Sequence, residues 1–128
     1  MKNKEGIVIL LDFDGTVVTH EYPRIGKDIG AVEVLTKLVD NGHNLILFTM
    51  RSGKTLDEAV NWFKVNNIPL YGVQTNPTQK NWTTSPKAYG NLIIDDTCLG
   101  IPLNYNSPRP FVDWEKVERM LINMNLIN

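Results

Sequence analysis

The chain has 128 residues, of which 42% are hydrophobic and 21% are charged, and its formal net charge is −1. This length predicts a single domain spanning residues 1–128, with room for a core but not for a second domain. The charge gives no broad basic field and no strong nucleic-acid signature, and no apolar stretch approaches the roughly 18 residues that span a bilayer, so no membrane partner is expected.

The first predicted element is an apolar strand that begins at Ile7 and leads directly into Asp-Phe-Asp-Gly-Thr at 12–16. Side chains two residues apart in a strand face the same way, so Asp12 and Asp14 can converge. One carboxylate can then attack while the other manages protons, and Mg²⁺ between them would relieve their repulsion. Gly15 lets the backbone turn tightly beside a substrate. Taken alone, the pattern fits a solvated turn after a buried strand equally well.

A loop at 17–27 follows, and a helix is predicted over 29–39 because apolar residues recur there at helical spacing. The loop is a candidate flap over the site. Its candidate substrate-binding groups are His20, Tyr22 and Arg24, since the arginine fork suits phosphate recognition.

A second apolar run, at 44–49, ends in the hydroxyl of Thr49, and a helix is predicted over 54–66. Arg51 comes two residues after Thr49, so it is a further candidate for substrate binding at the same sheet edge. The next predicted strand covers 68–74.

Two lysines in the following segment are candidates for the site. The Ser-Pro pair at 85–86 is typical of a helix start, which favours Lys87 over Lys80. The loop at 75–85 is a candidate wall of the site, where an exposed Trp82 could stack on a base or sugar.

Another apolar run begins at Asn91 and ends in a pair of carboxylates, Asp95 and Asp96. Cys98 follows this pair, and it is interpreted as a packing residue rather than a catalyst. Because Cys98 is the one cysteine of the chain, no internal disulfide can form, and a reducing cytoplasmic location is expected.

The last predicted element is a helix with an apolar stripe from Trp114 to Met124, capped by Asp113. Strands and helices thus alternate, which predicts an α/β fold: a three-layer, Rossmann-like parallel sheet with helices on both faces. Ligands bind such sheets beyond the carboxyl ends of the strands. The carboxylates that end the first and last strands would meet there, and such a cluster argues for a bound cation.

In their order, these motifs resemble those of the haloacid dehalogenase superfamily, in particular its small capless phosphatases. Phosphatases of that superfamily carry Asp-x-Asp-Gly-Thr, a Thr or Ser after the next strand, a Lys, and a pair of Asp residues. The matching residues span most of the chain: Asp12 to Thr16, Thr49, Lys87, and Asp95 with Asp96. The resemblance implies the superfamily's Rossmann-like fold and a Mg²⁺-dependent phosphomonoester hydrolase.

The resemblance also implies the catalytic roles. Asp12 is the nucleophile that forms an aspartyl-phosphate, and Asp14 is the general acid and base. Thr49 hydrogen-bonds the phosphoryl group, and Lys87 offsets its charge.

The implied Mg²⁺ ligands are Asp12, the main-chain carbonyl of Asp14, and Asp96. Asp95 orients the lysine or a metal-bound water, although the sequence leaves open whether Asp95 or Asp96 touches the ion. The predicted substrate-binding residues surround these groups: Gly15, Thr16, His20, Arg24 and Arg51.

The spacing of the motifs leaves no room for a substantial cap domain, because 35 residues separate Asp14 from Thr49 and 38 separate Thr49 from Lys87. An open site suits a phosphorylated small molecule or a phosphate on a polymer end, unless a homo-oligomer covers it.

Three other functions remain as alternatives. A polynucleotide-end phosphatase fits the open site, but the chain lacks an Arg/Lys-rich stripe with interleaved aromatic residues. A receiver-like phosphoacceptor module would have its acidic pair first rather than last. A catalytically silent Mg²⁺-binding module would be expected to have lost a motif residue, and none is missing.

Overall fold

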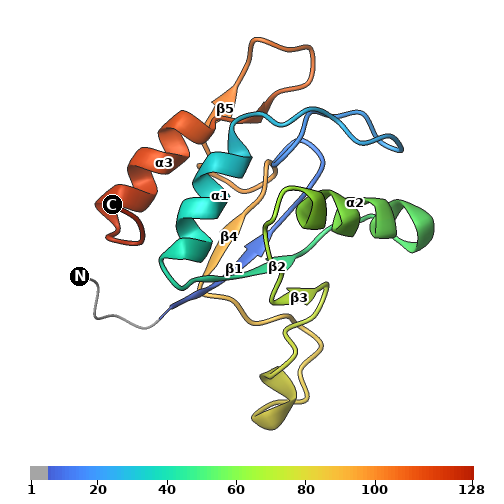
Figure 1. Ribbon diagram of the computed structural model, residues 1–128, viewed down its shortest axis with the longest axis vertical. Helices are drawn as coiled ribbons and strands as arrows, with labels where there is room; N and C mark the ends of the chain where they lie inside the picture. The colour runs from blue at the N-terminus through green and yellow to red at the C-terminus, as the bar shows by residue number, and fades with distance from the viewer. Residues whose placement is uncertain (1–5) are drawn as a thin grey trace.

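The computed structural model describes residues 6–128, so residues 1–5 of the predicted domain lie outside the described part. The elements follow one another in Figure 1 as β1 (Val8–Leu11), α1 (Ala31–Asp40), β2 (Asn44–Leu47), α2 (Gly53–Val65), β3 (Gly72–Val73), a 3₁₀ helix η1 (Gln79–Asn81), β4 (Leu92–Ile94), β5 (Leu103–Asn104), β6 (Phe111–Val112) and α3 (Trp114–Asn123). The predicted α/β fold with a parallel sheet is confirmed.

The sheet has the strand order β3-β2-β1-β4, and all its neighbours are parallel. In the register, Leu11 of β1 lies opposite Leu47 of β2 and Ile94 of β4. The chain runs from β1 outward to β3 and then returns to the other side of β1, so the strand order reverses between β1 and β4. Such a switch point is where open parallel sheets bind ligands.

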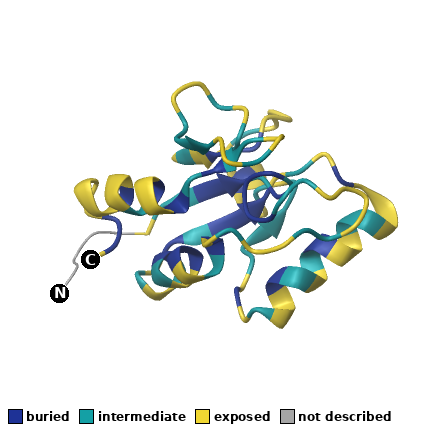
Figure 2. Ribbon diagram, turned by 90° about the horizontal axis from the view of Figure 1, so that it is seen from above, coloured by how far each residue is buried: buried dark blue, intermediate teal, exposed yellow. Residues whose placement is uncertain are grey.

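The three α-helices pack on one face of the sheet. Ile9 and Leu11 of β1 point into a core shared with α1, α2 and α3, whereas Leu10 and Ile46 point to the opposite face, where Ala88 covers them. Buried residues are therefore concentrated in the strands and in the helix surfaces turned toward them (Figure 2).

The prediction of helices on both faces is wrong for the second face. Right-handed crossovers place the β3–β4 connection there, but this connection contains η1 and no α-helix. No helix begins at 85–86, and the predicted strand at 68–74 is reduced to Gly72–Val73. Prolines at 77 and 86 and a run of Thr, Asn and Ser compete with helix formation in this segment.

The helix ends follow local rules. The carboxylate of Asp28 accepts hydrogen bonds from the N–H groups of Ala31 (2.9 Å) and Val32 (3.2 Å), which caps α1. The Asp113 carboxylate accepts one from the N–H of Lys116, as predicted for the start of α3. Within the described residues, the helices are too short or too polar to cross a membrane.

Candidate active site

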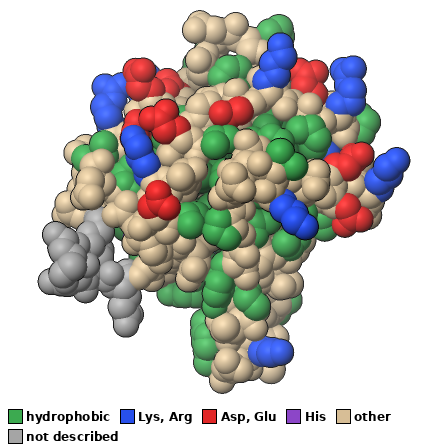
Figure 3. Space-filling model, in the orientation of Figure 1, with side chains coloured by type: hydrophobic (Ala, Val, Ile, Leu, Met, Phe, Trp, Pro, Cys, Tyr) green, Lys and Arg blue, Asp and Glu red, His purple; other side chains and the backbone are tan. Residues whose placement is uncertain are grey.

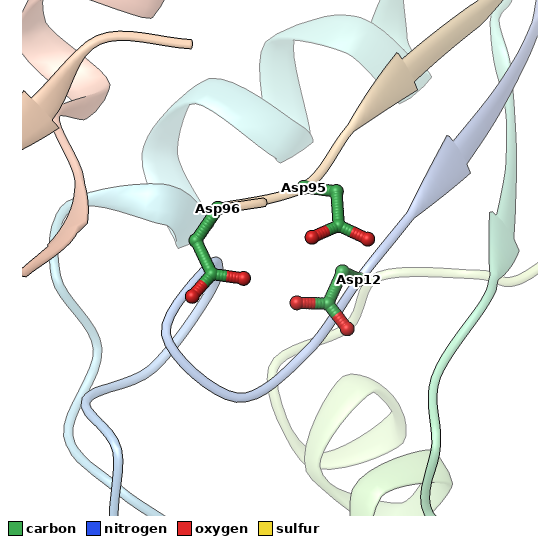
Figure 4. Close-up of side chains that lie close together, drawn as sticks. All are labelled: Asp12, Asp95 and Asp96. Atoms are coloured by element: carbon green, nitrogen blue, oxygen red, sulfur yellow. The ribbon is translucent and has the colours of Figure 1, made fainter. Parts of the chain in front are cut away.

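Three carboxylates converge at the carboxyl ends of β1 and β4. Asp12 follows β1 directly, and Asp95 and Asp96 follow β4 (Figure 4). Each offers one oxygen, and these oxygens lie within 4.8 Å of one another. Among residues 6–128 no other cluster of three His, Cys, Asp or Glu side chains has a geometry suited to a metal ion. The predicted convergence is confirmed for Asp12, Asp95 and Asp96, but it is wrong for the Asp14 carboxylate, which binds Arg51 instead.

The electrostatics of this carboxylate cluster favour a cation. Burial, together with the charges of Asp95 and Asp96, raises the pKa of Asp12 to about 7, against the opposing effect of a hydrogen bond from Thr16. Burial also raises the pKa of Asp96. Carboxylates so close together resist ionising at the same time, and oxygen-liganded Mg²⁺ would relieve that repulsion.

Thr16 links the two strand ends. Its hydroxyl donates to Oδ2 of Asp12 (2.7 Å) and accepts from the N–H of Asp96 (2.9 Å). The indole N–H of Trp114 donates to the Thr16 carbonyl at 2.6 Å, which ties α3 to this turn. Because the side chain of Thr16 is fully buried, its predicted role in substrate binding does not fit. Thr16 instead positions Asp12 and Asp96.

The loop at 17–27 reaches the carboxylate cluster through His20. Nε2 of His20 lies 3.2 Å from Oδ2 of Asp96 and 3.2 Å from the carbonyl of Pro110. Both partners are acceptors, so Nε2 carries a hydrogen. Gly15 makes this approach possible, because its φ is +78° and a Cβ there would overlap the imidazole ring. His20 thus holds Asp96 rather than pointing at a free substrate position.

Arg51 forms a bidentate ion pair with Asp14. Its Nε and Nη2 each donate to one carboxylate oxygen of Asp14 at 2.7 Å. The remaining donors go to main-chain carbonyls: Nη1 to Pro23 and Thr55, both at 3.2 Å, and Nη2 to Arg24 at 2.7 Å. All five N–H groups of the guanidinium are therefore used, and its side chain is 1% exposed.

The predicted role of Arg51 in phosphate binding is therefore wrong for this conformation, since no donor remains for a substrate. Arg51 is a positioning residue for Asp14. The Asp14 carboxylate consequently lies outside the carboxylate cluster, so Asp14 can serve a metal only through its main-chain carbonyl, the ligand atom that the resemblance implies.

Thr49 lies in a loop that Gln74 fixes. The Gln74 amide accepts from the N–H of Thr49 (2.9 Å) and donates to its carbonyl (2.6 Å). The Thr49 hydroxyl accepts from the N–H of Arg51 at 3.1 Å, and its own proton has no acceptor among the described residues. This hydroxyl can therefore donate to a phosphoryl group. Gln74, which has an uncommon φ of +65°, could not be recognised from any sequence pattern.

The lysines do not join the site. Lys80 and Lys87 lie in the crossover that enters the amino end of β4, where Asn91 donates to the Val8 carbonyl at 2.7 Å. Asp12 and Asp96 lie at the opposite ends of these strands. The prediction that Lys87, or its alternative Lys80, offsets the phosphoryl charge is wrong, because the helix that would bring a lysine to the carboxyl edge is missing.

Two other predicted residues have minor roles. The Arg24 side chain is 82% exposed and pairs with Glu21 at 3.6 Å, so only its carbonyl, bound by Arg51, supports the site. Cys98 lies near the carboxylates, and burial followed by their charges raises its pKa. A thiol that resists ionisation is a poor nucleophile, which fits the interpretation of Cys98 as a packing residue.

The crowding of the three carboxylates predicts an unusual pH dependence of the stability of the metal-free protein. A carboxyl group whose pKa rises from 3.8 to about 7 on folding stabilises the fold at low pH, and this contribution is lost as the pH rises through about 7. We expect the melting temperature in EDTA to fall between about pH 5 and about pH 8, and Mg²⁺ to restore it at the higher pH. Thermal unfolding of the wild type and Asp12→Asn tests this, since the fall should shrink in the variant. Equal pH profiles would contradict the crowding.

Comparison with known proteins establishes kinship but no activity. No protein-family model matches the sequence, and no curated protein is similar to it. A solved structure of a conserved protein from Bacteroides thetaiotaomicron is 35% identical, with a TM-score of 0.78, and the match covers 94% of this chain and 93% of that one. The chain therefore belongs to the same family as this conserved Bacteroides thetaiotaomicron protein.

Proposed function

We propose that the protein is a Mg²⁺-dependent phosphomonoester hydrolase of the haloacid dehalogenase type. The observation that carries this proposal is the convergence of Asp12, Asp95 and Asp96 beyond adjacent strand ends at the switch point of the sheet. The order of the motifs along the chain supports it. The three carboxylates would hold Mg²⁺, which would supply positive charge at the phosphoryl group and at the crowded oxygens.

Asp12 is the proposed nucleophile. The hydrogen bond from Thr16 fixes Oδ2 of Asp12, which leaves the other oxygen to attack phosphorus. This attack forms an Asp12–phosphoryl bond and breaks the bond to the leaving oxygen. Water then attacks the phosphorus, which releases inorganic phosphate and regenerates the carboxylate.

Asp14 is the proposed proton-transfer group. Asp14 would protonate the leaving oxygen in the first step, and the resulting carboxylate, held by Arg51, would accept a proton from the attacking water in the second step. The proton accepted from water can then pass to the leaving group of the next turnover. Thr49 is the proposed donor to the phosphoryl oxygens, because its hydroxyl proton is uncommitted within the described residues.

Release of phosphate from an aryl phosphate tests the proposal. We expect release in the presence of Mg²⁺, loss with EDTA, and recovery when excess Mg²⁺ is added. Asp57→Asn is a matched control, because Asp57 is an exposed carboxylate on α2 and should leave the rate unchanged. Metal binding without hydrolysis of any phosphomonoester would instead indicate the silent Mg²⁺-binding module.

A further inference from the structure

The crossover at residues 75–90 is an ordered structure that the proposed chemistry does not use. It projects at the lower end of Figure 1, away from the carboxyl ends of the strands. The buried amide of Gln79 organises it: this amide donates to the carbonyls of Ser85 (3.0 Å) and Lys87 (2.7 Å) and accepts from the N–H of Tyr89 (2.6 Å). These bonds fix the backbone from which the exposed side chains of the crossover extend.

Two aromatic rings are exposed on this crossover. Trp82 is 63% exposed and Tyr89 is 44% exposed, and their rings meet edge to face with centroids 5.4 Å apart. Both rings line a cavity of about 300 Å³, together with Lys87. A neighbouring cavity of about 240 Å³ is lined in part by Lys80. Exposed rings held in place offer faces on which planar groups can stack.

The segment that carries these rings has basic residues but no acidic ones. Residues 59–94 contain three lysines and no Asp or Glu, so all 14 acidic residues lie elsewhere and the net charge of −1 conceals a local excess of positive charge. Neither Lys80 nor Lys87 forms an ion pair within residues 6–128. In Figure 3 the lower projection shows hydrophobic and basic side chains and no acidic ones on the visible face.

We propose that residues 75–90 bind single-stranded nucleic acid, with bases stacking on Trp82 and Tyr89 and phosphates attracted to Lys80 and Lys87. In a duplex the bases stack on one another, so their faces cannot contact the two rings. A neutral sugar carries no charge that would attract the unpaired lysines. Every base offers a face for stacking, and each phosphate offers a charge to a lysine. This inference uses no residue of the carboxylate cluster, so it does not depend on the proposed hydrolase activity.

Fluorescence anisotropy of a labelled oligothymidine, measured at low salt in EDTA, tests the proposal without any hydrolysis. We expect the wild type to bind and Trp82→Ala to bind about tenfold more weakly, because stacking on one aromatic ring is lost. Tyr105→Ala is the matched control, since Tyr105 is a 73% exposed aromatic residue next to β5, outside the crossover, and binding should be unchanged. Circular dichroism of each variant confirms the fold.

The salt dependence of binding tests the contribution of Lys80 and Lys87. Each phosphate contact on a single strand adds about 0.7 to the slope of log affinity against log salt, so Lys80→Gln with Lys87→Gln should lower the slope by about 1.4. Lys64→Gln, at an exposed lysine on α2, should leave it unchanged. The proposal is overturned if the wild type does not bind, if Tyr105→Ala weakens binding as much as Trp82→Ala, or if Asp12→Asn alone abolishes it.

Discussion

Asp12→Asn is expected to lower phosphate release by at least about a thousandfold while leaving the protein folded. An amide is a far poorer nucleophile than a carboxylate, so the aspartyl-phosphate cannot form. The same change removes one charge from a crowded cluster. Because burial and neighbouring carboxylates raise the Asp12 pKa to about 7, the variant should also be more stable than the wild type at about pH 8 without metal. The size of this gain is about 1–2 kcal/mol after allowance for partial exposure.

Loss of activity together with a gain in stability is a signature that simple misfolding cannot produce. Steady-state kinetics and thermal unfolding in EDTA measure the two effects on the same sample. Phosphate release by Asp12→Asn at the wild-type rate would rule out Asp12 as the nucleophile.

Arg51→Ala is expected to destabilise the protein by about 3–5 kcal/mol, because it leaves the largely buried Asp14 carboxylate without its partner. Three main-chain carbonyls lose their donor as well. The part that remains folded should show a kcat lower by about a hundredfold with a smaller change in KM, since Asp14 is no longer held in place. Arg51→Lys should not restore the activity, because an ammonium group cannot reproduce the planar fork.

Arg24→Ala provides the matched control, since Arg24 is an exposed arginine with a weak surface ion pair. Its effect on stability should stay within about 0.5 kcal/mol. Denaturant unfolding and steady-state kinetics compare the two variants. If Arg51→Ala raised KM and left kcat and stability unchanged, Arg51 would be a substrate-binding residue after all.

The carboxylate cluster could be predicted from the sequence because it depends on local rules. One strand ends at Leu11, directly before Asp12, another ends at Ile94, directly before Asp95, and parallel strands present these ends at one edge. The prediction also requires β1 and β4 to be neighbours, and they are, because Leu11 pairs with Ile94.

The partners of the functional side chains could not be predicted, because they are set by contacts distant in sequence. Arg51 reaches Asp14 across 37 residues and reaches carbonyls of the loop at 17–27. The sequence indicated only that an arginine lies near the right edge. Similarly, the contact between His20 and Asp96 depends on the space left by Gly15.

The prediction that Lys87 lies in the site is wrong for a different reason. The Ser-Pro pair at 85–86 has the residue types of a helix start, but propensity is a weak guide where the following residues do not continue an apolar stripe. The crossover takes an irregular path around Gln79 instead. An amide that organises a loop leaves no periodic pattern in the sequence.

The measurement that tests the central claim most directly is the location of the phosphoryl group during turnover. Asp14→Asn lacks the base for the second step, so acid quenching of this variant with an aryl phosphate and Mg²⁺ should trap the intermediate. Mass spectrometry of its peptides is expected to find the phosphoryl group on Asp12, and not when Asp12→Asn is added or Mg²⁺ is removed. A phosphoryl group on any other residue, or turnover with none on Asp12, would contradict the account.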